Sequence, residues 1–167
     1  MSSSLSKDDR TLGDALRRIG GRHIVQALQA IEDRSAADAV HEVRRSCKKL
    51  RGLIRLVRTG FDDFADEDDA IRDIAHPLSE VRDAKVLLDT FDFLAERAQG
   101  HAAREVMLRL HHVLKARRKT QREAARAENL LDNARQKLLA TQARCQLWAV
   151  EGEGWAIVGD GVAMTYA

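Results

Sequence analysis

The side chains best suited to chemistry form a row of cations in the segment His41–Arg58, which reads HEVRRSCKKLRGLIRLVR. With the 100° per residue of an α-helix, one side of this segment is apolar and the other is cationic. The cationic side contains the following residues: His41, Arg44, Arg45, Lys48, Lys49, Arg51, Arg55 and Arg58. Like charges three or four residues apart repel each other, and Glu42 is the one carboxylate of the segment. The row therefore predicts a neutralising group outside the helix, and a polyanion is the simplest candidate.

Arginine and lysine are side chains that bind phosphate well. A guanidinium donates a fork of hydrogen bonds to phosphate oxygens, and an ammonium adds a mobile point charge. A linear phosphate polymer repeats its charge along its length, as this helix repeats its cations. His41 lies at the start of the row and would donate to phosphate more strongly when protonated. The alternative explanation is an ordinary solvated helix face, with His41 as a surface or structural residue.

Charge is segregated along the chain, although the net charge is +2. Residues 1–59 contain 13 Lys or Arg against 7 Asp or Glu, and residues 101–146 contain 11 against 4. Residues 60–100 reverse the balance, with 4 against 12, and are expected to neutralise the far side of the bundle. Separate basic and acidic regions attract an anion locally without making the whole chain basic. The second basic segment adds four candidate phosphate ligands: Lys115, Arg118, Lys119 and Arg122.

These side chains must be positioned by helices. Leu, Ala, Arg, Glu and Asp dominate the composition and β-branched runs are nearly absent, which favours an all-α protein. We expect an antiparallel four-helix-type bundle with long helices and an irregular C-terminal tail. Residues 1–10 are predicted to be a flexible tail and residues 11–146 the bundle. The Gly-rich residues 147–167 are predicted to be irregular.

The first two helices have clear boundaries in the sequence. The first is expected over residues 11–31, where the Gly20-Gly21 pair marks a kink or a close helix crossing. The second is expected over residues 36–59, between an N-cap at Ser35 and a C′ glycine at Gly60. The cationic row lies within this second helix.

The later helices are expected in three stretches. The acidic residues 62–69 open a short third helix, and Pro77 breaks or restarts it. A further helix is predicted over residues 78–98. Residues 101–148 contain neither Gly nor Pro, which indicates either one very long helix or a break near residues 129–133.

Several functional classes are disfavoured. No segment approaches the length of a membrane span and the N-terminus lacks the apolar stretch of a signal peptide, so a cytoplasmic protein without membrane contact is expected. Cys47 and Cys145 are predicted to be free thiols in a reducing compartment. The neighbouring His111 and His112 point in different directions and no metal-ligand spacing is present, so no metal and no cofactor are expected.

The segment His41–Arg58 resembles the signature of the CHAD domain, an all-helical family named for its histidines. The family pattern places a His, an Arg three residues later, then two adjacent basic residues and a further Arg on one helix. Five residues of this chain match that pattern: His41, Arg44, Lys48, Lys49 and Arg51.

Two further segments resemble landmarks of the same family. LSEVRDAKVLL is similar to an Arg-Asp pair followed by Val, through Arg82, Asp83 and Val86, although Lys85 stands where the family usually has Asp. GWAIVGDGVAMTYA resembles a Gly-rich turn that ends in Thr-Tyr, through three residues: Gly161, Thr165 and Tyr166. The order and spacing of all three landmarks agree, so the resemblance covers nearly the whole chain.

The resemblance implies two helical bundles related by a pseudo-twofold axis, which offer basic residues to a shared positive cavity. It also implies a module without catalytic activity that binds inorganic polyphosphate, commonly in bacteria and often beside triphosphate-processing domains. Such a module is expected in the cytoplasm and at polyphosphate granules. The chain stops at Ala167, where the second basic helix of the family is expected, so it corresponds to the first half of the domain. A homodimer would complete the two-bundle surface.

The expected binding residues combine the cationic row, the Arg-Asp pair and the second basic segment. They bind inorganic polyphosphate or another phosphate-rich polyanion, and none is expected to be catalytic. Arg82 would be oriented by Asp83, although this pair is equally well explained as an interhelical ion pair. The full set is as follows: His41, Arg44, Arg45, Lys48, Lys49, Arg51, Arg55, Arg82, Lys115, Arg118, Lys119 and Arg122.

Two other classes of function remain open from the sequence. A basic groove also attracts nucleic acid, but neither basic segment contains an aromatic residue for base stacking. A histidine phosphotransfer protein is also a four-helix bundle with an exposed His and a basic residue three positions later, as at His41 and Arg44. That pattern requires Gly at the next position, where this chain has Arg45.

Overall fold

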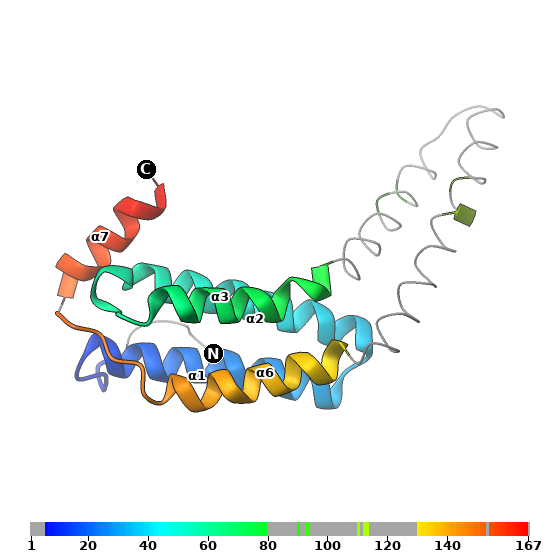
Figure 1. Cartoon of the computed structure of the whole chain (residues 1–167), viewed down its shortest axis with the longest axis horizontal. Coiled ribbons are helices and arrows are strands. Elements are labelled where there is room, and N and C mark those ends of the chain that lie inside the picture. The colour runs from blue at the N-terminus through cyan, green and yellow to red at the C-terminus, as the bar shows by residue number, and fades with distance from the viewer. Residues whose placement is uncertain are drawn as a thin grey trace.

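The computed structural model of the chain describes residues 6–79, 90, 93, 110, 112–113, 130–152 and 154–166. Five α-helices and one 3₁₀ helix are defined in this part (Figure 1), and it contains no strand, so the all-α prediction is confirmed. The elements have these bounds: α1 Leu12–Asp33, α2 Ala36–Leu56, the 3₁₀ helix η1 Arg58–Gly60, α3 Phe64–Ala75, α6 Leu130–Cys145 and α7 Gly154–Tyr166. Most of the predicted helix over residues 78–98 and most of the segment 101–129 lie outside the described residues.

Local hydrogen bonds fix where the first two helices begin. At the start of α1, the Thr11 hydroxyl accepts from the Asp14 amide at 3.0 Å while the Asp14 carboxylate accepts from the Thr11 amide at 3.1 Å. This reciprocal capping box satisfies amide groups that have no partner within the helix. Ser35 caps α2 as predicted, because its hydroxyl accepts from the Asp38 amide.

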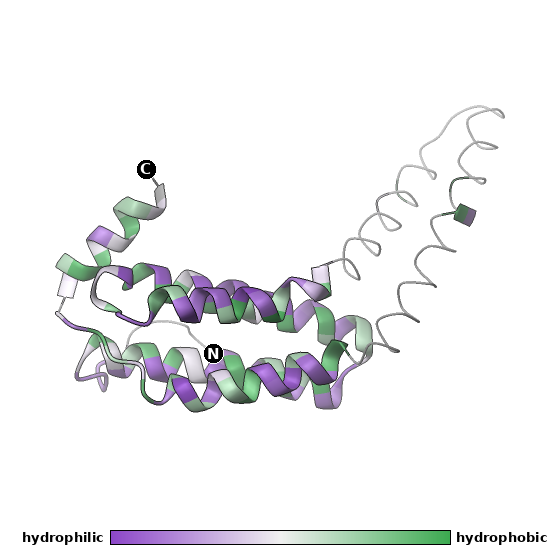
Figure 2. Cartoon of the chain, in the orientation of Figure 1, coloured by the Kyte–Doolittle hydropathy of each residue, from purple (hydrophilic) through white to green (hydrophobic). Residues whose placement is uncertain are grey.

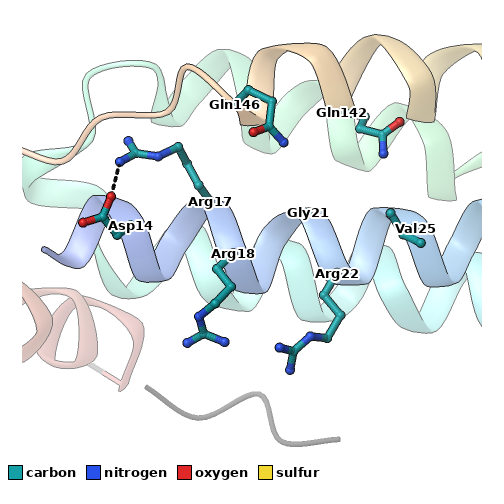
Figure 3. A pocket seen from close by; sticks show the side chains of 8 residues that line it. All are labelled: Asp14, Arg17, Arg18, Gly21, Arg22, Val25, Gln142 and Gln146. Carbon is teal, nitrogen blue, oxygen red and sulfur yellow. Dashed lines mark hydrogen bonds and ion pairs between the residues drawn. The ribbon is translucent and has the colours of Figure 1, made fainter. Parts of the chain in front are cut away.

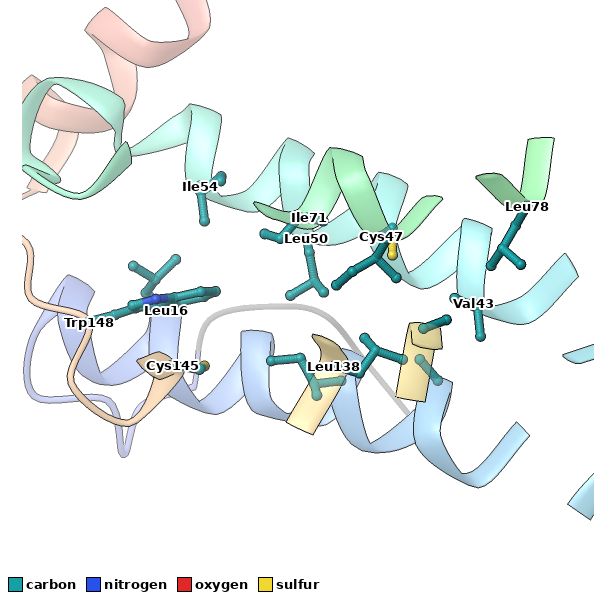
Figure 4. Close-up of a cluster of buried hydrophobic side chains, with 14 of the residues drawn as sticks. Leu16, Val43, Cys47, Leu50, Ile54, Ile71, Leu78, Leu138, Cys145 and Trp148 are labelled. Carbon is teal, nitrogen blue, oxygen red and sulfur yellow. The ribbon is translucent and has the colours of Figure 1, made fainter. Parts of the chain in front are cut away.

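Helices α1, α2, α3 and α6 pack around one apolar core. The neighbours are α1 with α2 and α6, and α3 with α2 and α6. Polar and apolar residues recur along each of these helices (Figure 2), and the residues that are buried between the helices are mostly apolar. The largest buried side chains meet between the four helices (Figure 4), and burial of each contributes about 1.5–3 kcal/mol. They include Leu16, Ile24, Leu50, Ile54, Ile71, Leu138 and Trp148.

Gly20 lets α1 approach the end of α6 closely. A Cβ atom at this position would lie 2.8 Å from Cζ3 of Trp148 and 3.3 Å from Sγ of Cys145. Trp148 is 1% exposed and meets the Phe61 ring edge-on at a centroid distance of 5.7 Å. The Gly20-Gly21 pair therefore marks a close crossing, one of the two readings that the sequence offered.

An ion pair between a buried carboxylate and a partly exposed guanidinium joins α3 to α6. The Glu67 carboxylate, whose side chain is 5% exposed, accepts from Nε and Nη2 of Arg144 at 2.6 and 3.2 Å. The hydroxyl of Thr141 also accepts from Arg144 at 3.2 Å. A carboxylate removed from water in this way needs such partners to remain charged.

Residues 147–167 are not irregular as predicted, since most of them form α7. Two glycines precede or open this helix in the left-handed region, Gly152 at φ 85° and Gly154 at φ 66°. The helix then packs on the end of α2 through Gly161, where any side chain would overlap with the backbone carbonyl of Leu56. The glycines that suggested a loop thus serve as turn and contact positions, and tertiary packing determines the helix.

Gly60 is not the predicted left-handed C′ residue of α2. The helix ends at Leu56 and continues as η1, and among the described glycines positive φ occurs at Gly152 and Gly154 instead. Gly60 allows the segment after α6 to pass close to the backbone of η1. At this contact the Gly60 carbonyl accepts a hydrogen bond from the Glu151 amide at 2.7 Å. A side chain at Gly60 would overlap with the Glu151 carbonyl.

The third helix agrees with its prediction in outline. It begins at Phe64 with Asp66 and Glu67 in its first turn, and it ends at Ala75. Residues 77–79 are helical again, so Pro77 restarts the helix. Among the helices of the described part, none is long and apolar enough to cross a bilayer.

The close crossing at Gly20 predicts opposite effects of two Gly→Ala substitutions. Gly20→Ala should lower the free energy of unfolding by about 1–3 kcal/mol, because the new methyl group would press on the Trp148 ring. Gly52→Ala should raise it by about 0.5–1 kcal/mol, since nothing lies within 4 Å of a Cβ there and alanine favours the helix. Urea unfolding followed by circular dichroism measures both values. Equal effects of the two substitutions would contradict the close crossing.

Candidate functional site

The cationic side of α2 is divided into two rows by its position beside α3. We define the inner row as Arg44, Arg51 and Arg55, whose side chains reach residues of α3 or the turn after it. We define the outer row as His41, Arg45, Lys48 and Lys49, all four of which are exposed. The sequence analysis predicted one continuous cationic face. It could not separate the two rows, because the pattern of one helix does not show where the neighbouring helix lies.

Asp68 of α3 neutralises two members of the inner row. Its carboxylate oxygens accept from Nε and Nη2 of Arg51 at 2.8 and 2.7 Å, and Nε of Arg55 lies 3.5 Å from Oδ1. The Asp68 side chain is 13% exposed. The hydrogen bonds from Arg51 lower the pKa of Asp68 and raise that of Arg51. The acidic region therefore does not simply neutralise the far side of the bundle, since one of its residues faces the cationic row directly.

Arg44 closes the C-terminal end of α3. Its Nη1 donates to the Ala75 carbonyl at 3.1 Å and to the Ser79 hydroxyl. A cation at this position satisfies a carbonyl of the last turn and interacts favourably with the helix dipole. Its Nε is buried without a hydrogen-bond partner in the described part. Arg44 thus has a structural role that its place in the motif did not reveal.

The outer row has few partners. Arg45, whose side chain is 56% exposed, lies 3.5 Å from Glu42, which Arg34 also approaches at 3.5 Å. For Lys48 and Lys49, the described part of the chain provides neither an ion pair nor a hydrogen bond. Two adjacent ammonium groups therefore remain available to solvent and to any anion in it.

The basic surface of the outer row continues onto α1. The buried His23 accepts or donates a hydrogen bond with Gln26 at 3.2 Å, and burial lowers the pKa of its imidazole. The positive charges of Lys49, Arg22 and Arg45 lower this pKa further. Arg22 of α1 and Arg45 and Lys49 of α2 are therefore close enough to act electrostatically on one imidazole. The sequence interpretation missed Arg22, although the run RRIGGR at 17–22 was a signal that α1 is also basic on one side.

The remaining predicted ligands cannot be placed. Arg82, Lys115, Arg118, Lys119 and Arg122 lie outside the described residues. Whether they approach α2 stays a prediction, as does the pairing of Arg82 with Asp83.

The cysteines do not suggest redox or metal chemistry. Cys47 and Cys145 are free and buried, as predicted for the thiols, and burial raises their pKa values to about 12 and about 11. In the described ranges, no group of three His, Cys, Asp or Glu residues could hold a metal ion.

We call the bidentate ion pair between Arg51 and Asp68 the clamp. It predicts a loss of stability that depends on pH. Asp68→Asn should lower the free energy of unfolding at pH 7 by about 1–3 kcal/mol, because a charge-assisted bidentate contact is removed. Because folding lowers the pKa of Asp68, its stabilisation is complete above the ordinary pKa of an aspartate, about 3.9, and is lost as the pH falls through the lower pKa of the folded state. The difference between wild type and variant should therefore vanish in acid.

Asp69→Asn is the matched control for that measurement. Asp69 is the next residue and its side chain is 62% exposed, paired with Arg72 at 2.9 Å. An exposed pair of this kind contributes about 0–1 kcal/mol. Urea unfolding from pH 2.5 to 7 compares the two variants, and a similar loss in both would contradict a special role of the clamp.

Comparison with protein families gives one match, the CHAD domain, over residues 19–157. Comparison with curated proteins and with solved structures gives no match. The matched range contains all of α2, α3 and α6, including the five residues of the His-Arg motif, but it ends before Gly161, Thr165 and Tyr166. These three residues lie in α7, where the Thr165 hydroxyl donates to the Gly161 carbonyl at 2.8 Å. Because the match covers most of its length, the chain belongs to the CHAD domain family.

Proposed function

We propose that this chain is a binding module without catalytic activity that holds inorganic polyphosphate on the outer row of α2. The CHAD family is linked to polyphosphate binding in general. The observation that carries the proposal for this chain is the exposure of Lys48 and Lys49 without an ion pair in the described part. Lys48 and Lys49 belong to a row of cations, and nothing in that part neutralises these two. Repulsion between like charges in the row raises its free energy, and an external polyanion removes this repulsion.

The arrangement of the outer row suits a polymer better than a single phosphate. His41, Arg45 and Lys48 follow one another at spacings of four and three residues and Lys49 comes directly after them, so the row extends along about 12 Å of the helix. The basic surface continues through Arg22 on α1. Several weak, exposed contacts of this kind add up over a repeating ligand, whereas one phosphate would engage one or two of them. A protein with this function would act where polyphosphate accumulates, in the bacterial cytoplasm and its granules.

Arg51 and Arg55 of the inner row would also bind polyphosphate once their ion pairs with Asp68 are broken. Arg51 and Arg55 already present guanidinium groups to one anionic group, the Asp68 carboxylate. Their side chains are 27% and 42% exposed, so they are accessible from the same side as Lys48. A polyphosphate chain offers more negative charge than this carboxylate. We therefore place Arg51 and Arg55 in the proposed site as secondary ligands.

Removal of the two lysines tests the proposed site. Wild type should bind long-chain polyphosphate with a dissociation constant of roughly 1 µM or below at low salt, and affinity should fall steeply as salt rises. Lys48→Ala with Lys49→Ala should weaken binding at least roughly tenfold and reduce the salt dependence. Isothermal titration calorimetry at several salt concentrations measures both quantities.

A control variant that loses the same amount of charge elsewhere distinguishes binding at a specific site from attraction by the overall positive charge of the protein. Arg72→Ala with Arg135→Ala also removes two cations, but from exposed positions on α3 and α6. It should change affinity by less than about threefold. Equal losses in the two double variants, or tighter binding of single-stranded DNA than of polyphosphate, would count against the proposal.

Asp68→Asn should have opposite effects on stability and on polyphosphate affinity. The substitution frees Arg51 and Arg55 from their internal anion, so binding should become roughly three- to tenfold tighter while the protein becomes less stable. Asp69→Asn makes the same change of charge one residue away and should tighten binding far less. If both variants bind alike, the two arginines are not ligands, and only the outer row remains in the site.

A further inference from the structure

The groove between α1 and α6 contains polar side chains that do not converge on one point. It is lined by three arginines of α1 and two glutamines of α6, but Figure 3 shows that Arg18 and Arg22 point away from the glutamines. Arg18 is also held by the Asp9 carboxylate, whose two oxygens accept from its Nε and Nη2 at 2.7 and 2.6 Å. The groove therefore does not gather its donors around a single ligand.

Two arginines do converge, at the turn between α1 and α2. Arg34 is the first residue after α1 and Arg45 lies within α2. Nη1 of each arginine nevertheless lies 3.5 Å from the same atom, Oε2 of Glu42. The two Nη1 atoms are therefore no more than twice this distance apart. One anionic group placed between them can contact both guanidinium groups.

The three side chains of this cluster differ in exposure. The Glu42 side chain is 13% exposed, whereas those of Arg34 and Arg45 are 53% and 56% exposed. The carboxylate thus lies deeper than the two guanidinium groups, which are accessible to solvent. Because one carboxylate faces two cations, one positive charge of the cluster remains uncompensated. The cluster therefore presents its cations, and not its carboxylate, to an approaching anion.

Glu42 holds its arginines less tightly than Asp68 holds Arg51. Its contacts with Arg34 and Arg45 are 3.5 Å long, beyond the usual range of about 2.7–3.2 Å for an N–H···O hydrogen bond. The two contacts of the clamp, at 2.8 and 2.7 Å, are within that range. An external phosphate thus replaces weaker contacts at this cluster than at the clamp.

The cluster continues the outer row toward the N-terminal end of α2. Arg45 belongs to the outer row and lies three residues before Lys48, on the same side of the helix. Arg34 adds a cation beyond Arg45, from outside the helix. The carboxylates of Asp33 and Asp38, which are exposed residues on either side of this turn in the sequence, limit the cationic surface at that end.

We propose that the polyphosphate surface continues across the turn between α1 and α2 to Arg34, where Arg34 and Arg45 together bind one phosphate unit of the polymer. That unit replaces Glu42 as the anion that both guanidinium groups contact, and their forked donors suit its oxygens. Glu42 positions the two arginines before the polymer binds. This inference rests on the proposed function and adds a ligand that α2 alone does not supply.

Titration with long-chain polyphosphate at low salt tests the extension to Arg34. Arg34→Ala should weaken binding roughly three- to fivefold and reduce the slope of log affinity against log salt by about one unit, because one phosphate contact is lost. Arg34→Lys keeps the charge and should retain most of the affinity. The matched control is Arg72→Ala, since Arg72 lies in an ion pair on α3 with a side chain that is 52% exposed. It should change affinity by less than about 1.5-fold.

Substitution of Glu42 tests the position that the two arginines share. Glu42→Gln should tighten binding roughly three- to tenfold, because the competing carboxylate is lost. Asp33→Asn removes the same charge beside Arg34, but Asp33 is exposed and makes no ion pair in the described part of the chain. It should tighten binding by less than about twofold. Equal effects of the two substitutions would overturn the shared phosphate position.

The outcomes separate this inference from the proposed function. If Lys48→Ala with Lys49→Ala weakens binding while Arg34→Ala matches Arg72→Ala, the extension is overturned and the proposed function stands. If Arg34→Ala weakens binding and the lysine variant does not, Arg34 remains a ligand and the lysines leave the proposed site. Absence of binding by wild type overturns both. Circular dichroism verifies folding, and Arg34→Gln, which keeps more of the side chain, decides the question if Arg34→Ala does not fold.

Discussion

The structure depends on how α2 combines a buried apolar side with a cationic side. Val43, Leu50 and Ile54 are fully buried, so the rotation of the helix is fixed and its cations must face outward or toward a neighbour. Asp68 on α3 then meets Arg51 and Arg55 at the boundary between core and solvent. This contact neutralises the part of the row that cannot be fully hydrated, and it positions α3 along α2. Arg44 caps the end of α3 and Arg45 pairs with Glu42, while Lys48 and Lys49 are exposed to solvent.

The types of cation follow this division. Every member of the inner row is an arginine, whose planar group can donate to a carboxylate or a carbonyl while partly buried. The two lysines are in the outer row, where a strongly hydrated ammonium keeps its water. Each Arg in the inner row therefore has a structural partner, whereas Lys48 and Lys49 have none in the described part of the chain. A motif that joins His41, Arg44, Lys48, Lys49 and Arg51 thus contains residues with different roles.

Features that depend on one helix could be predicted from the sequence, and features that depend on two could not. The apolar and cationic faces of α2 and its cap at Ser35 follow from local pattern, whereas the Gly20-Gly21 pair left a kink and a close crossing both open, because the crossing depends on Cys145 and Trp148. The clamp at Asp68 required knowledge of the relative rotation of α2 and α3. The helix α7 was missed because its glycines were taken as loop residues, although Gly161 is needed for contact with the end of α2. Arg22 was missed because its place near Lys49 depends on the packing of α1 against α2, which the sequence of α1 alone does not show.

Internal carboxylates also compete with any external anion for the same arginines. Asp68 holds Arg51 on one surface and Asp9 holds Arg18 on another, each through a fork of two hydrogen bonds. A monovalent anion that replaced either carboxylate would exchange one such contact for another and would lose its translational freedom as well. An intramolecular partner also has a high effective concentration, which a free ion at low concentration does not match. A phosphate polymer or oligomer overcomes both disadvantages, because its further charges reach cations that the carboxylates do not engage. Under the proposed function, the same arrangement would reduce binding of abundant small anions and retain binding of multivalent ones.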